Sequence, residues 1–260
     1  MAIATLLAQL IGTLYLMKKV YSCKLKHYLK IECFIPRSEY IMGLIKQSAP
    51  IMFTMLMIMF GVFNIFYFVG QFGELATAGY GTSVRLEQVL LLPVIGLNTA
   101  VISIAGQNYG AKNYDRVRET YTTSMIFGFV FMTLAGVFIY FTAHFFMSKF
   151  TDDLQVIAAG VYYLQVAAFI GPIYPTFFIT SALFQALKKP IFSLYMTIMR
   201  LTLLPFLSLY YVINIKGGEF QDIFKTILVT NWGMGILVLI FVTFYLKRHL
   251  NIPLRKLFFL

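Results

Sequence analysis

The sequence predicts an all-α polytopic membrane protein, in which a lobe of six transmembrane helices is preceded by one partial transmembrane helix. Of the 260 residues, 60% are hydrophobic and only 12% are charged, and the mean hydropathy is +0.80. Soluble domains average about 45–50% apolar and about 25% charged residues. The apolar residues also gather in long runs, and a helix needs about 20 such residues to cross a bilayer.

The chain divides into three predicted domains. Residues 1–17 are an apolar run that ends at Lys18 and Lys19, and we predict a partial transmembrane helix there. The basic residues follow this run and no small-residue cleavage site appears, so the run is not typical of a signal peptide. Residues 18–40 are the longest non-apolar stretch and are predicted to be a basic cytoplasmic linker. Residues 41–260 form the predicted six-helix lobe.

Six spans are predicted within the lobe. An amphipathic lead-in precedes Ser48-Ala49-Pro50, which fits the first turn of a helix because the missing proline amide does no harm there. The second span in the lobe has about 31 residues, or roughly 46 Å of straight helix against a membrane core of about 30 Å. It is therefore expected to tilt, to bend at Pro93 or to protrude. The predicted spans cover residues 49–69, 75–105, 122–147, 156–184, 190–213 and 223–246.

Basic residues in the loops predict the orientation. Alternate loops together hold 16 Lys and Arg on one side and 3 on the other. Cytoplasmic loops of membrane proteins carry an excess of these residues. We therefore predict that the linker and the C-terminus are cytoplasmic, that the loop at Lys149 is external, and that the protein lies in the plasma membrane. The net charge of +11 then serves orientation in the bilayer, and no nucleic acid partner is expected.

Signatures of enzyme chemistry are missing from the sequence. The three histidines are scattered and form neither a zinc-binding nor a triad pattern. No glycine-rich nucleotide loop with a following lysine occurs. Cys23 and Cys33 both fall in the linker without a second pair, so reduced thiols and no metal site are expected. We predict that the protein is not an enzyme and needs no resident cofactor.

Glu87 is the only carboxylate inside an apolar run. Charges within a membrane span are costly and tend to mark pathways for ions or substrates. Helical geometry places Asn98 within about 20° of Glu87 and roughly 16 Å along the axis, while Arg85 points almost the opposite way. Arg200 is expected roughly 15 Å deep, near the midplane.

Amides and prolines within the spans have two interpretations. The amides of Asn64 and Gln88 are candidates for substrate contacts, although a plain interhelical hydrogen bond is the alternative. Pro172 and Pro175 interrupt the predicted fifth of seven spans, counting the partial one. Helices broken at membrane depth are typical where they line a cavity, but proline is also simply frequent in membrane helices.

One block of residues carries a family resemblance. It begins with GELATAGYG at 73–81 and RLE at 85–87, continues with Leu92-Pro93, Gly96 and Ala100, and closes with GQNYGAK at 106–112 before Arg116 and Arg118. This block resembles the multidrug and toxic compound extrusion (MATE) transporters, whose superfamily also holds polysaccharide and lipid flippases. The stretch from Ser181 to Pro190, followed by Arg200, is also similar to that family.

The resemblance implies two six-helix lobes related by a pseudo-twofold axis and joined by a cytoplasmic connection. Residues 41–260 then correspond to the C-terminal transporter lobe, 18–40 to the connection and 1–17 to the last helix of the N-terminal lobe. A complete protein is expected to include the N-terminal six-helix lobe, so this chain is expected to be a fragment. The implied activity is secondary active antiport, exporting a small organic cation against inward H+ or Na+.

The resemblance carries over one acidic site residue, and the polar groups within the spans supply the other binding candidates. Many members carry an acidic residue in the helix after the linker, but residues 49–69 have none, so Glu87 is the acid carried over. A flippase for a lipid-linked oligosaccharide is the alternative, although it should have a strongly basic cavity; a non-transporting membrane scaffold is another. The cation- or substrate-binding candidates are Glu87, Asn98, Gln88, Asn64 and Arg200. The family-motif or hinge candidates are Arg85, Pro93, Gly96, Gly106, Gln107, Asn108, Gly110, Pro172 and Pro175.

Overall fold

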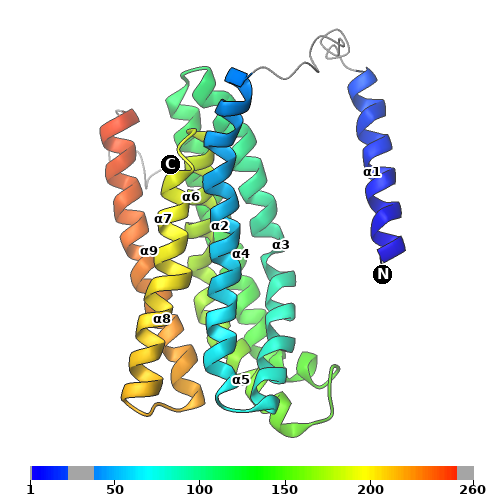
Figure 1. Cartoon of the computed structure of the whole chain (residues 1–260), viewed down its shortest axis with the longest axis vertical. Helices are drawn as coiled ribbons and strands as arrows, with labels where there is room; N and C mark the ends of the chain where they lie inside the picture. Colours follow the sequence, from blue (N-terminus) through cyan, green and yellow to red (C-terminus); the bar gives the residue numbers. More distant parts are fainter. Residues whose placement is uncertain (1, 23–37, 251–260) are drawn as a thin grey trace. The chain divides into compact units, whose positions relative to one another are not determined.

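The computed structural model describes residues 2–22 and 38–250, and the regular elements in these ranges are helices (Figure 1). Six of the described helices are long and apolar enough to cross a membrane. The chain separates into two compact units, residues 1–46 and 47–260. The all-α fold with six long apolar helices is therefore as predicted.

The first unit contains α1 (Ala2–Ser22) and the beginning of α2 (Ser38–Gly70). α1 continues past the predicted end of the apolar run because lysine is a good helix former and does not stop a helix. The predicted linker therefore loses its first residues to α1 and its last to α2. The rest of it, residues 23–37, lies outside the described residues. α1 is not among the six spans found in the described part of the chain.

α2 is one continuous helix of 33 residues, with Pro50 inside it. The predicted helix start at Ser48-Ala49-Pro50 is therefore wrong, as is the separate lead-in before it. Proline inside a helix removes one backbone hydrogen bond, which neighbouring groups in a membrane can compensate. One turn later the Thr54 hydroxyl donates to the carbonyl of Pro50 at 2.7 Å, so polar groups near the proline are satisfied within the helix.

The second unit is a bundle of long helices, two of which are interrupted (Figure 1). The predicted span at residues 156–184 is broken by a 3-10 turn, and the predicted span at residues 190–213 contains two wide π-helical segments. These interruptions fall near Pro172 and Pro205, while Pro93 lies within an unbroken α3. The elements are α3 (Glu74–Gly110), α4 (Tyr114–Met147), α5 (Leu154–Ile170), η3 (Gly171–Ile173), α6 (Tyr174–Ala186), α7 (Ile191–Thr197), η4 (Ile198–Leu203), α8 (Leu204–Leu209), η5 (Tyr210–Ile215) and α9 (Phe220–Leu250).

α3 continues past residue 105, where the predicted span ends. The helix continues through Gly106 to Gly110, and the left-handed residue is Lys112, with φ of 59°. Glycine permits a turn but does not require one. The backbone reverses direction after Lys112, where the amide of Asn113 donates to the carbonyl of Asn108 at 2.8 Å.

Small residues allow α3, α4 and α5 to approach closely. A Cβ at Gly79 would lie 2.6 Å from the carbonyl oxygen of Val156, and one at Gly136 would lie 2.5 Å from that of Ala168. Membrane helices commonly pack in this way, because lipid provides little hydrophobic force to drive helices together. The close packing sets α3 against α4, α5 and α6, the arrangement in which the candidate site is built.

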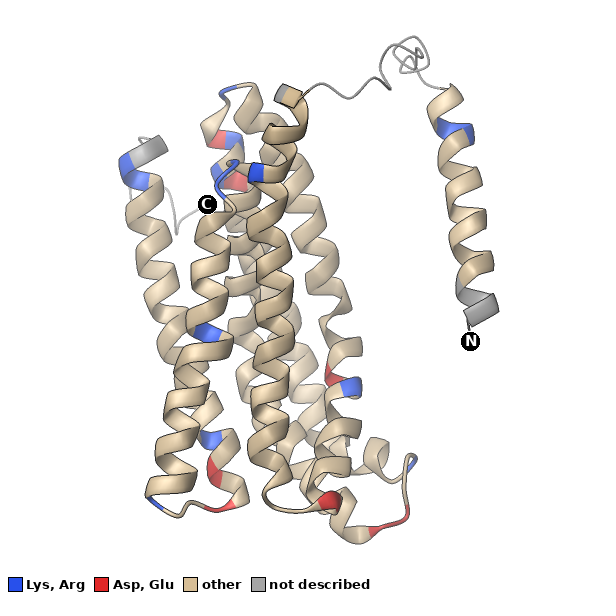
Figure 2. Ribbon diagram, in the orientation of Figure 1, with Lys and Arg blue, Asp and Glu red and all other residues tan. Residues whose placement is uncertain are grey.

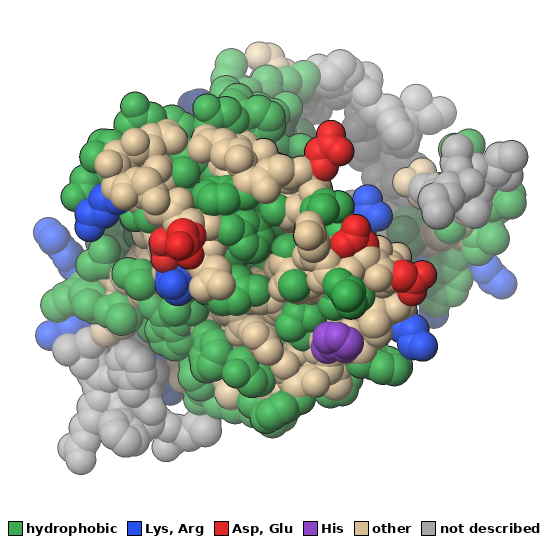
Figure 3. Space-filling view, turned by 90° about the horizontal axis from the view of Figure 1, so that it is seen from below, with side chains coloured by type: hydrophobic (Ala, Val, Ile, Leu, Met, Phe, Trp, Pro, Cys, Tyr) green, Lys and Arg blue, Asp and Glu red, His purple; other side chains and the backbone are tan. Residues whose placement is uncertain are grey.

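Charged residues lie mainly near the two ends of the second unit, with a few along the helices between them (Figure 2). The α3–α4 connection with the first turns of α4, the α6–α7 connection and the end of α9 hold seven basic residues, with Asp115 and Glu119 as acidic neighbours: Lys112, Arg116, Arg118, Lys188, Lys189, Lys247 and Arg248. The opposite end, viewed in Figure 3, shows acidic and basic side chains among apolar ones. This asymmetry agrees with the alternating loops inferred from the sequence.

Candidate functional site

The carboxylate of Glu87 is buried on α3 and is held by two tyrosines. The hydroxyl of Tyr163 on α5 donates to Oε2 at 2.6 Å, and the hydroxyl of Tyr174 on α6 donates to Oε1 at 2.9 Å. Both carboxylate oxygens therefore have a hydrogen-bond donor, as a buried charged group requires. Charge-assisted bonds of this kind are stronger than bonds between neutral groups.

The two tyrosines lie on opposite sides of the helix break between α5 and α6. Tyr163 belongs to α5, the turn at Gly171–Ile173 follows, and Tyr174 is the first residue of α6. Glu87 therefore connects α3 to both halves of an interrupted helix. Both halves thus share this one carboxylate as a hydrogen-bond acceptor.

Arg200 lies on η4 and makes a second set of contacts beside the carboxylate. Its Nε donates to Oδ1 of Asn231 on α9 at 2.9 Å. Its guanidinium carbon lies 3.8 Å from the ring centroid of Phe177 and 4.9 Å from that of Tyr174. Wide π-helical turns such as η4 occur frequently at functional sites. We call Glu87, Tyr163, Tyr174, Arg200 and Asn231 the carboxylate cluster.

Glu87 and Arg200 do not form a direct ion pair within the part of the chain that the structure describes. Tyr174 contacts both residues: its hydroxyl binds the carboxylate while its ring lies against the guanidinium. The cluster thus brings an acidic and a basic group together around a shared tyrosine.

The other predicted binding residues are placed differently. The side-chain amide of Asn98 donates to the backbone carbonyl of Phe178 on α6 at 2.7 Å, which is an interhelical hydrogen bond. Gln88 is exposed. Asn64 is half-buried on α2, and its side chain has no hydrogen bond to any described residue. Of the five binding candidates, the structure brings together Glu87 and Arg200.

The predicted family-motif and hinge residues fall into three groups. Arg85, Pro93 and Gly96 are exposed on α3, and a Cβ at Gly96 would meet nothing within 4 Å. Gly106 approaches Ala186 on α6, whereas Gln107 and Gly110 are exposed. At the broken span, Pro172 is half-buried and Pro175 packs against Gly128 of α4. These hinge and motif roles remain predictions.

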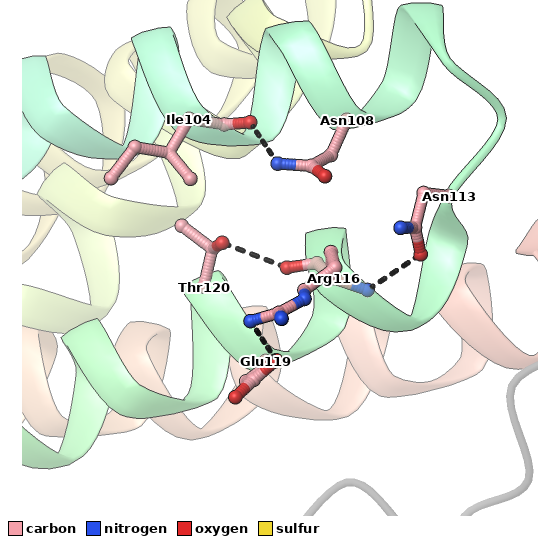
Figure 4. A network of polar contacts seen from close by, with 6 residues as sticks. All are labelled: Ile104, Asn108, Asn113, Arg116, Glu119 and Thr120. Atoms are coloured by element: carbon pink, nitrogen blue, oxygen red, sulfur yellow. Dashed lines mark hydrogen bonds and ion pairs between the residues drawn. The ribbon is translucent and has the colours of Figure 1, made fainter.

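Local hydrogen bonds order the turn between α3 and α4 (Figure 4). Asn108 donates through its side chain to the carbonyl of Ile104 at 2.8 Å. Asn113 caps α4 by accepting from the amide of Arg116, whose guanidinium pairs with Glu119 at 3.3 Å. Asparagine is favoured at a helix start because its side chain satisfies a free amide. Asn108 and Arg116 of the motif therefore take part in local hydrogen bonds of this turn.

Sequence reasoning missed three members of the carboxylate cluster. Tyr163 and Tyr174 gave no signal, because tyrosine is common in this chain, which contains 17 of them. Asn231 gave a weak one, since it is an amide within the apolar run of α9. Its Nδ2 also donates to the carbonyl of Ile227 at 2.9 Å, so both ends of the amide are bonded.

A small cavity of about 10 Å³ adjoins Glu87 and is lined mainly by apolar residues of α3, α4 and α5. That volume is close to the minimum for one water molecule. Two larger depressions, of about 460 and 310 Å³, lie at the end seen in Figure 3 and do not include Glu87. Among the described residues, no group of three or more His, Cys, Asp or Glu side chains is placed to hold a metal ion.

A helical membrane bundle with an interrupted span and a buried carboxylate has the architecture of a transporter lobe. The sequence profile of the MatE family matches residues 50–211. The chain belongs to this family of membrane transporters, as the resemblance predicted.

Curated relatives have varied names. The chain is 30% identical over 184 residues to the FAD transporter of Shewanella oneidensis, covering 69% of this chain and 38% of that protein. It is 27% identical over 185 residues to the probable multidrug resistance protein YpnP of Bacillus subtilis, covering 71% of this chain and 41% of that protein. The chain therefore spans about 40% of the length of these relatives.

Solved structures share the fold. A MOP superfamily transporter from Pyrococcus furiosus gives a TM-score of 0.86 at 21% identity, covering 97% of this chain and 57% of that one. An outward-facing multidrug resistance MATE family transporter gives 0.85 at 20% identity, with coverage of 97% and 56%. The chain thus corresponds to a little over half of each solved transporter, consistent with one of two lobes.

Proposed function

We propose that this chain supplies the C-terminal lobe of an ion-coupled secondary transporter that works by alternating access. The observation that carries the proposal is the position of Glu87. It is the only buried acidic side chain among the described residues, and it is bonded to both sides of a helix break. Intramembrane ionisable residues at such positions commonly serve ion pathways.

The chemistry of the carboxylate explains how an ion affects the helices. An ionised carboxylate only accepts hydrogen bonds, and here each oxygen accepts one from a tyrosine. A proton on either oxygen turns one acceptor into a donor, and a bound Na+ competes with the tyrosine hydroxyls for the same oxygens. Either ion therefore weakens the connection between α3 and the α5–α6 break, and it changes the relative stability of two conformations.

In the complete protein, an N-terminal six-helix lobe would provide the other wall of the substrate path. The proposed direction is export from the cell across the plasma membrane, with the linker and C-terminus in the cytoplasm. A small organic cation is the substrate class that the family resemblance implies. The name of the YpnP relative, a probable multidrug resistance protein, supports this class.

An organic anion is a second candidate substrate, and two observations favour it. The Shewanella relative is named an FAD transporter, and FAD carries negatively charged phosphates. Within the described spans, Arg200 also places a positive charge in the carboxylate cluster. A lipid-linked oligosaccharide flippase has less support, since Arg85 and Arg200 are the only Lys or Arg residues well inside the predicted spans, and Lys225 lies at the edge of the last one.

Transport in vesicles tests the proposal. This chain, co-reconstituted with a separately expressed N-terminal lobe of a relative, should accumulate or expel a labelled organic substrate when a pH or Na+ gradient is imposed. The chain without that lobe is the matched control and should show no transport. If neither preparation moves the labelled substrate in response to the gradient, ion-coupled transport is contradicted and a scaffold is favoured.

A further inference from the structure

Arg200 has hydrogen-bond donors that the described part of the chain does not use. Its Nε is bonded to Asn231, but neither terminal nitrogen has a hydrogen bond to a described residue. Neither of these nitrogens is sealed inside the protein, and the side chain as a whole is half-buried. The two terminal nitrogens therefore keep some exposed surface and have no hydrogen-bond partner among the described residues.

The contacts of Arg200 leave its outer edge free. Asn231 fixes the Nε side, and the aromatic side chains of Phe177 and Tyr174 lie against the guanidinium at 3.8 and 4.9 Å. The unoccupied edge carries the two terminal nitrogens side by side. This is the edge with which arginine binds a carboxylate or a phosphate through two parallel hydrogen bonds.

Glu87 does not provide the missing partner. Its two oxygens accept hydrogen bonds from Tyr163 and Tyr174, and no ion pair within 4 Å joins it to Arg200 among the described residues. Charges within a membrane span are normally paired, because an uncompensated one is costly. An anion from outside the described chain would complete the coordination of Arg200.

The surroundings of Arg200 indicate what that anion carries. The turn bearing Arg200 packs on α2, where Leu201 meets Gly61 and the Thr202 hydroxyl donates to the carbonyl of Met57 at 3.4 Å. Large apolar side chains on this stretch of α2 are exposed: Met59, Phe60 and Phe63. The outer face of α2 beside the turn that bears Arg200 is therefore apolar.

We propose that Arg200 binds the acidic group of the transported molecule, and that this molecule is an apolar organic anion with one carboxylate or phosphate. That the bound molecule is also transported rests on the function proposed above, whereas the binding of such an anion does not. Arg200 then determines substrate class, and Asn231 positions its guanidinium. The same chemistry exists in anionic lipid headgroups, which the experiment must separate from a soluble substrate.

The test compares two fluorescent coumarins that differ in charge. The purified chain in phosphatidylcholine nanodiscs is titrated with 4-methylumbelliferyl phosphate and with neutral 7-methoxy-4-methylcoumarin. The anion should bind roughly 10- to 100-fold more tightly, the range expected for hydrogen bonds to a charged group. Arg200→Gln should abolish this preference, whereas the matched control Arg85→Gln, at an exposed arginine of α3, should keep it.

Several results would overturn the proposal. Equal binding of the two coumarins by the wild-type chain would do so, and so would an unchanged preference in Arg200→Gln. If phosphatidylglycerol in the nanodiscs displaces the phosphate probe from wild type at trace amounts, the ligand is a lipid headgroup and the substrate assignment fails. If Arg200→Gln does not accumulate, Arg200→Lys is measured instead. Lysine keeps the positive charge but lacks the two parallel N–H donors of arginine, so the preference for the anionic coumarin should fall.

Binding and transport separate the two proposals. Anion binding that depends on Arg200, without gradient-driven transport, would support the binding site and contradict the proposed function. Gradient-driven transport of an organic cation, without any binding of the phosphate probe, would support the proposed function and contradict the anion site.

Discussion

Tyr174, the first residue of α6 after the helix break, donates a hydrogen bond of 2.9 Å to the carboxylate of Glu87. Tyr163 makes the equivalent bond from the other side of that break. The carboxylate is therefore part of the structure that fixes the geometry of the interrupted helix. This relationship makes the state of Glu87 and the shape of the break depend on each other.

Removing either tyrosine hydroxyl should weaken this connection. Tyr163→Phe and Tyr174→Phe should each cost about 1.5–3 kcal/mol of stability, because each removes a hydrogen bond to a charged group. They should also reduce coupled transport. Thermal unfolding in detergent and vesicle transport are the measurements.

Tyr121→Phe is the matched control for these two variants. Tyr121 is also buried, and its hydroxyl shares a 3.0 Å hydrogen bond with Thr180 between α4 and α6, away from Glu87. Its loss should cost about 1 kcal/mol and leave coupling intact. Equal transport defects in all three variants would indicate a general packing effect and no special role for the Glu87 bonds.

The close helix contacts should be intolerant of even one added methyl group. Gly136→Ala places its Cβ against the backbone carbonyl of Ala168, which cannot rotate away, and should destabilise the protein by about 1–3 kcal/mol. Gly96→Ala meets nothing within 4 Å and should be neutral or slightly stabilising. Thermal unfolding of the two variants side by side checks this difference.

Gly96 also tests the predicted hinge at Pro93 and Gly96. If α3 bends there during transport, Gly96→Ala should fold normally but transport more slowly, because alanine restricts the backbone. An unchanged transport rate in the well-folded variant would remove Gly96 from the hinge.

Thiol accessibility tests the proposed orientation. In intact cells, an impermeant thiol reagent should label Asp152→Cys in a background where Cys23 and Cys33 are serine, because Asp152 is exposed in the loop proposed to be external. The native Cys23 should react only after the membrane is opened. Labelling of Cys23 in intact cells would reverse the topology.

Apolar run length was enough to predict the helical bundle and its approximate spans. Helix ends were less predictable, because the residues that seemed to terminate helices do not. Pro50 lies inside α2, and Gly106 continues α3, since neither residue type forces a turn when its neighbours favour helix. Local propensity is a weak signal where tertiary contacts and the membrane environment select the conformation.

The candidate site was predictable only in part, for a similar reason. Glu87 and Arg200 stand out because charges are rare in apolar runs. Their partners are ordinary residues whose importance depends on which helices face each other, and one sequence does not specify that. Tyr163 meets Glu87 only because α5 packs on α3, and Asn231 meets Arg200 only because α9 lies beside η4.

The central claim is that Glu87 couples ion occupancy to transport, and Glu87→Gln tests it most directly. Glutamine keeps the size and accepts a hydrogen bond through one oxygen, but it cannot take up a proton or hold Na+ by charge. The variant should reach the membrane near the wild-type level and lose gradient-driven transport, while Glu74→Gln, at an exposed position on the same helix, should keep it. The contrary result is a Glu87→Gln protein that fails to accumulate and is restored by Arg200→Met, because Glu87 would then be a structural counter-charge for Arg200.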